Sequence, residues 1–98
     1  MLIKFYYAIG TIANLEKELK GISDPYRLGL QLGIEDSYLD GMEKNHSGDV
    51  ARQRTAMIKH WYNNTAESER TWGRVADAVN ALGDHRNLES RLRELGNN

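Results

Sequence analysis

Hydrophobic residues recur every three or four positions along most of this chain, which is the spacing of one face of an α-helix. The sequence has one proline and no run of β-branched residues, so extended sheet structure is not expected. Glycines, an Asp–Pro pair and an Asn-rich turn interrupt the pattern and divide it into six predicted helices. The predicted helices span about 12–22, 25–33, 35–45, 49–63, 71–83 and 88–96.

The predicted helices begin with recognisable capping residues. Thr11, Asp49 and Thr71 are expected N-caps, because their side-chain oxygens can accept a hydrogen bond from the free N–H groups of a first turn. Asp24 followed by Pro25 marks another start, since proline lacks only an N–H that the first turn leaves unpaired. The first two segments could also be halves of one helix that bends at Pro25.

One face of each predicted helix supplies the expected core. Trp61 and Trp72 are the expected anchors of this core, because each can bury a large area. The short loops, without repeat or linker, predict one compact antiparallel all-α bundle over 11–96. The expected inward positions from 49 onward are Val50, Arg54, Met57, Ile58, Trp61, Trp72, Val75, Ala76, Val79, Leu82, Leu88, Leu92 and Leu95.

The apolar stretch Met1–Gly10 lies outside this pattern. It is about half as long as a bilayer span needs and has no small-residue cleavage site. Its alternating apolar residues favour a strand-like or helical arm packed on the bundle. The other interpretation is the tail end of a preceding region of a longer protein.

Composition narrows the classes of function. The chain has 13 basic and 14 acidic residues, which argues against a nucleic-acid binder. It has no cysteine, so a disulfide scaffold, a thiolate zinc site and a cysteine nucleophile are excluded. The three histidines lack the spacing of a metal site, and no serine-nucleophile or phosphate-loop motif is present. We therefore expect no catalysis, cofactor, metal, small-molecule substrate or membrane insertion.

The charged residues form two separate ridges on the predicted helices. Asp36, Asp40 and Glu43 recur at the spacing of one helix face. Arg52 and Lys59 share a face of the helix over 49–63. Ridges of opposite sign allow copies of a domain to associate head to tail, although solvated helix faces carry similar patterns.

The order of several motifs resembles the death-domain family over about Thr11–Leu95. The Leu28–Ile34 run, Leu-Gly-Leu-Gln-Leu-Gly-Ile, followed by Leu39, Met42 and Glu43, looks like the start of that domain. Other stretches resemble its fourth, fifth and sixth helices. These are Met57-Ile58-Lys59-His60-Trp61-Tyr62, Thr71-Trp72-Gly73-Arg74-Val75 and Leu88 to Leu95.

The resemblance implies a six-helix antiparallel Greek-key bundle that catalyses nothing. Such domains bind other death domains, either copies of themselves or different ones, in cytoplasmic signalling assemblies for apoptosis, inflammation or innate immunity. In these assemblies a face of helices 1 and 4 meets helices 2 and 3 of a neighbour. Carried onto this chain, the resemblance assigns one side to Arg52, Gln53 and Lys59, and the other to Asp36, Asp40 and Glu43.

Two departures and several rival interpretations accompany the resemblance. Pro25 stands where the family often has tryptophan, and Arg54 occupies an inward position, from which we expect it to extend to the surface. One rival is another death-fold adaptor, such as a caspase-recruitment domain. The others are a small helix-turn-helix nucleic-acid binder and a helical fragment of a larger enzyme.

Overall fold

The computed structural model describes residues 8–97, and its regular structure is helical throughout this range. The predicted all-α fold is confirmed, and the segments on either side of residues 20–24 are two separate helices. The outer part of the predicted arm, residues 1–7, lies outside the described residues. Of its last residues, Ala8 forms an isolated antiparallel bridge with Thr71, and Ile9 is buried in the core. The elements are α1 (Ile12–Leu19), α2 (Pro25–Gln31), α3 (Asp36–Asn45), α4 (Val50–Asn63), the 3-10 turn η2 (Glu67–Glu69), α5 (Trp72–Leu82) and α6 (Arg86–Asn97).

Four helices begin at the side-chain caps that the sequence predicted. Thr11, Asp24, Asp49 and Thr71 each accept a hydrogen bond of 3.1 Å from the backbone N–H three residues further on. A cap of this kind contributes on the order of 1 kcal/mol to helix stability. Gly83 ends α5 with a φ of 88°, a left-handed conformation that glycine adopts without steric cost.

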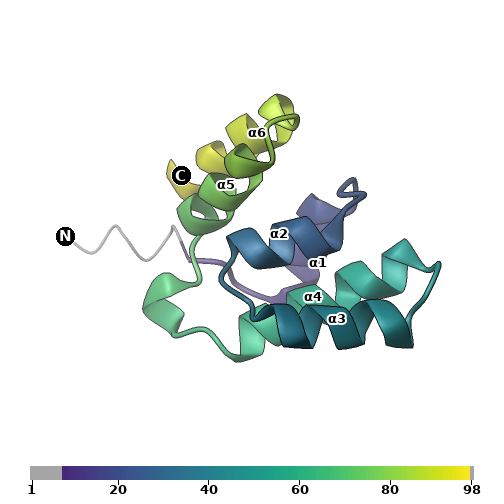
Figure 1. Ribbon diagram of the computed structural model, residues 1–98. Coiled ribbons are helices and arrows are strands. Elements are labelled where there is room, and N and C mark those ends of the chain that lie inside the picture. Colours follow the sequence, from purple (N-terminus) through teal and green to yellow (C-terminus); the bar gives the residue numbers. More distant parts are fainter. Residues whose placement is uncertain (1–7, 98) are drawn as a thin grey trace.

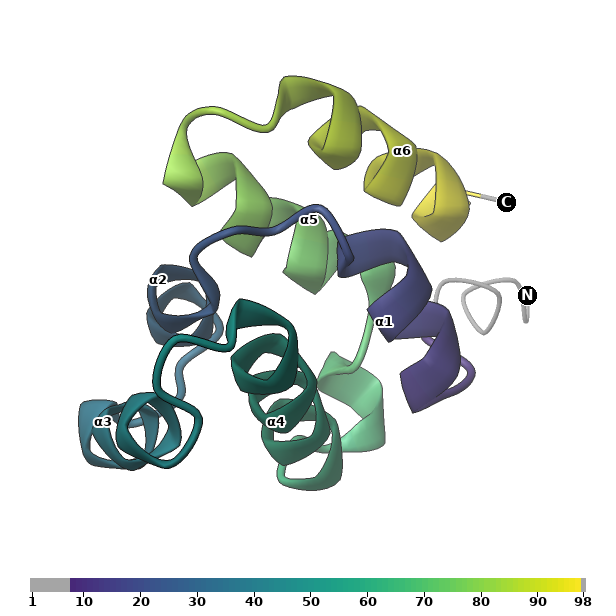
Figure 2. The same ribbon diagram turned by 90° about the vertical axis from the view of Figure 1, so that its right-hand side faces the viewer.

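The helices form two groups along a molecule whose longest dimension is 45 Å. Helices α5 and α6 pack side by side at one end, and α1 to α4 occupy the other (Figure 1). Helix α4 lies between α1 and α3, while α2 contacts α3, α4 and α5 (Figure 2). The short helix α2 therefore connects the two groups.

The core contains most of the positions that the helical periodicity indicated. Trp61 and Trp72 are both buried, as expected. The prediction that Val50 points inward is wrong, because Val50 is 39% exposed. Val50 is the first residue of α4, and the neighbouring helices leave this end of its inner face uncovered. The buried part of the stripe begins one turn later, at Gln53.

Gly29 allows α2 to approach its neighbours closely. A Cβ atom at this position would lie 2.7 Å from Leu39 Cδ2 and 3.2 Å from Met57 Cγ. Leu39 and Met57 are themselves completely buried, so they have little room to move away. The absence of a side chain at Gly29 thus sets the distance between α2 and the α3–α4 pair.

Arginine side chains tie helix C-termini to other helices. Arg27 of α2 donates a hydrogen bond of 3.2 Å to the carbonyl of Leu82, the last residue of α5. Arg74 of α5 donates in return to the carbonyl of Gln31 at the end of α2, at 3.0 Å. Arg54 of α4 donates instead to the carbonyl of Ile22 in the loop between α1 and α2, at 2.9 Å. Positive charge at a helix C-terminus is favourable, because unpaired carbonyls and the helix dipole make that end negative.

We predict that Gly29→Ala destabilises the fold although alanine is the better helix former. Overpacking a core typically costs about 1–3 kcal/mol, which outweighs the roughly 1 kcal/mol that alanine gains over glycine in a helix. The free energy of unfolding, measured by urea denaturation, should therefore fall.

Gly41→Ala is the matched control for this prediction. Gly41 also lies within a helix, but a Cβ there would meet no atom within 4 Å. This variant should gain about 0.5–1 kcal/mol from helix propensity. Equal effects of the two substitutions would contradict the close approach at Gly29.

Candidate functional site

The outer side of α3 carries three exposed carboxylates, Asp36, Asp40 and Glu43, which we call the acidic face. Helix α3 buries Leu39 and Met42, and this packing leaves the residues that follow each of them on the surface. Within residues 8–97, the three carboxylates form no ion pair with a lysine or arginine. The negative charge of the acidic face is therefore not neutralised by an ion pair within the described residues.

Tyr26 of α2 joins the acidic face through its hydroxyl group. The hydroxyl donates a hydrogen bond of 2.6 Å to Asp40 Oδ1. The pKa of Tyr26 is raised from 10.0 to about 12, chiefly by this hydrogen bond, then by burial, and then by the negative charges of Asp40, Asp36 and Glu43. All three carboxylates of the acidic face thus act on one hydroxyl. Tyr26 lies on another helix, so the spacing of charges along α3 did not indicate that it belongs to the site.

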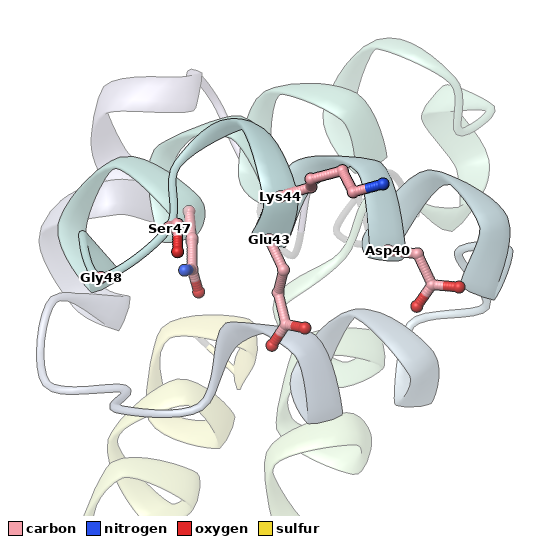
Figure 3. A pocket seen from close by; sticks show the side chains of 6 residues that line it. Asp40, Glu43, Lys44, Ser47 and Gly48 are labelled. Atoms are coloured by element: carbon pink, nitrogen blue, oxygen red, sulfur yellow. The ribbon is translucent and has the colours of Figure 1, made fainter.

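Two of the carboxylates border an open hollow of about 420 Å³ between α3 and the start of α4. Asp40 and Glu43 extend from one side of α3, while the Lys44 side chain runs along the helix (Figure 3). The hollow is shallow and polar, and it is wide open to solvent. The hollow thus lacks the enclosure and the apolar lining that are usual for a small-molecule site.

The expected cationic residues Arg52 and Lys59 are both exposed on α4, and we call them the cationic face. They border a second hollow, which shares no lining residue with the first. Arg52 Nε lies 3.5 Å from Asp49 Oδ2, although the arginine side chain remains 75% exposed. Lys59 forms no ion pair with any residue in 8–97. The two hollows are distinct but neighbouring, because His46 borders the second and Ser47, the next residue, borders the first.

The structure corrects the expected exposure of Gln53. This residue is only 8% exposed, and its Nε2 donates a hydrogen bond of 3.0 Å to the carbonyl of His46. The amide is buried because it pairs with a carbonyl at the end of α3. Gln53 borders the hollow of the acidic face, and it is absent from the hollow that Arg52 and Lys59 border.

His60 and His85 each contact a neighbouring side chain. The ring of His60 stacks on Tyr38 with 3.7 Å between the ring centroids, and His85 lies 3.2 Å from Asp84. No group of three or more potential ligands within residues 8–97 could hold a metal ion. None of the helices found there is long and apolar enough to cross a membrane.

Comparisons with known proteins add no assignment. The sequence matches no protein-family profile, and no curated protein or solved structure shows significant similarity. The death-domain resemblance therefore stays a prediction that rests on the motifs quoted above. The surface geometry provides the separate basis on which a function can be proposed.

We predict that Asp40→Asn lowers the pKa of Tyr26 from about 12 toward 10, because it removes the charge of the principal acceptor. NMR titration with ring-labelled tyrosine can follow Tyr26, with Tyr26→Phe as the assignment control. Asp77→Asn is the matched control, since Asp77 is paired with Arg93 on another part of the surface. An unchanged Tyr26 pKa in Asp40→Asn would contradict the hydrogen bond.

The raised pKa of Tyr26 predicts how its hydrogen bond to Asp40 contributes to the stability of the fold as the pH changes. The folded-state pKa of Tyr26 lies above its unfolded value of 10.0. Its contribution is therefore complete below pH 10 and is lost as the pH rises toward about 12. Urea denaturation of wild type and Tyr26→Phe across this range should show their difference in stability shrinking with rising pH.

Proposed function

We propose that this protein is a non-catalytic interaction module of the death-domain type, in which the acidic face of one copy binds the cationic face of another. One observation carries the proposal. Asp40 and Glu43 of α3 border one hollow, and Arg52 and Lys59 of α4 border another on the same chain. The proposal has each copy use both faces, one toward each neighbour.

The death-domain resemblance supplies the wider part of the proposal. It adds an antiparallel Greek-key path for the helices, a cytoplasmic location and the recruitment of signalling proteins for apoptosis or innate immunity. The helical fold and the order of its elements support this assignment. Partners that are recruited together activate one another because their effective concentration rises.

The proposed contact is weak as a single event. An exposed ion pair contributes about 0.2–1 kcal/mol, and salt screens it. A few such pairs hold two copies together only when their concentration is high. Because each copy has two complementary faces, repeated head-to-tail contacts can build a larger assembly. These properties suit a module that assembles when the local concentration of its copies rises.

Charge reversal tests the proposal. We expect Glu43→Lys on the acidic face and Lys59→Glu on the cationic face each to weaken self-association about tenfold or more. The reason is that an attractive contact becomes a like-charge contact, and about 1.4 kcal/mol corresponds to a factor of ten. Sedimentation or light scattering at low salt gives the dissociation constant.

Complementation separates this contact from general effects of charge. A mixture of the two single variants should associate again, because the acidic face that Lys59→Glu leaves intact can bind the cationic face that Glu43→Lys leaves intact. Glu94→Lys and Arg86→Glu, at exposed positions on α6, are matched controls and should behave as wild type. A wild-type chain that stays monomeric at millimolar concentration in low salt contradicts the proposal. A mixture that fails to associate contradicts it as well.

A further inference from the structure

We infer that Tyr26 is a positioning residue of the acidic face, which holds the carboxylate of Asp40 in place for a cation from a second copy of this chain. The inference rests on the proposed homotypic function and extends the acidic face from α3 onto α2. Periodicity on α3 alone does not indicate this role, because Tyr26 is on another helix.

The start of α2 fixes where the Tyr26 ring lies. Asp24 caps the helix and Pro25 occupies its first turn, so the backbone before Tyr26 is restrained. The ring is partly buried and packs against the hydrophobic core. Its hydroxyl therefore extends to Asp40 from a fixed base. A long surface side chain would lose more conformational freedom in making the same hydrogen bond.

Asp40 remains able to bind a cation while Tyr26 holds it. A carboxylate has two oxygens with about four acceptor positions, and Tyr26 fills one of them on Oδ1. The donor is neutral, so the negative charge of Asp40 persists. Within residues 8–97, no other side chain donates a hydrogen bond to this carboxylate.

The other two carboxylates of the acidic face lack such support. Neither Asp36 nor Glu43 forms a side-chain hydrogen bond within the described range. When a partner binds, each of them must lose the rotamer freedom that Asp40 has already lost. We therefore expect Asp40 to contribute more to the binding of a second copy than Asp36 or Glu43 does. The ammonium group of Lys59 on that second copy is the expected partner of Asp40.

The test is a double-mutant cycle on self-association. Tyr26→Phe keeps the ring and removes only the hydroxyl, and we expect it to weaken association about fivefold, which is the scale of immobilising one side chain. In an Asp40→Asn background the same substitution should have no further effect, because Tyr26 would act through the carboxylate. Tyr62→Phe removes a hydroxyl bonded to the Gly10 carbonyl instead, and it should leave association unchanged.

The outcomes separate this inference from the proposed function. If charge reversal weakens association and Tyr26→Phe does not, the positioning role is wrong while the homotypic contact stands. If Tyr26→Phe weakens association equally in the Asp40→Asn background, the residue contacts the partner directly and the inference is overturned. Stronger association of Tyr26→Phe would show that Tyr26 competes with the partner, which also overturns it. If charge reversal has no effect, the proposed function itself fails.

Discussion

The close approach of α2 at Gly29 is the constraint on which the rest of the structure depends. A helix of seven residues is too short to be stable alone, so α2 takes its position from its neighbours. On one side it packs against Leu39 and Met57 with no room for a Cβ. On the other, α2 and α5 cap each other's C-termini through Arg27 and Arg74. These contacts join the two groups of helices, together with the ion pair between Arg91 of α6 and Glu18 of α1.

The candidate surface is a consequence of this packing. In α3, the buried residue Leu39 is followed by Asp40, and buried Met42 is followed by Glu43. A rotation of α3 that changed its contact with α2 would therefore also move the carboxylates. The Tyr26 hydroxyl, which α2 carries, reaches Asp40 only because the two helices pack closely. Core packing and surface charge are fixed by the same contact.

Local features of the sequence predicted the helices, their caps and the buried tryptophans, because these depend on residues within one or two turns. Prediction failed where neighbouring elements decide the outcome. Val50 continues the apolar stripe of α4 but lies where nothing covers it. The resemblance grouped Gln53 with Arg52 and Lys59, yet its side chain is buried and its amide donates to a carbonyl at the end of α3. The Tyr26–Asp40 bond joins residues fourteen positions apart, which helical periodicity cannot relate.

The distribution of charge is compatible with the proposed association between copies. The net charge is −1, so copies repel one another little at long range, and the local faces decide how they meet. The two cations of α4 differ, since Arg52 already has Asp49 beside it, while Lys59 has no partner in the described range. On the acidic face, Asp40 accepts a hydrogen bond from Tyr26, whereas Asp36 and Glu43 accept none from a side chain in the described range. In the proposed contact, pairing Lys59 with Asp40 would therefore cost the least free energy. Neither side chain gives up an ion pair of the described range, and the Asp40 carboxylate is already ordered by Tyr26.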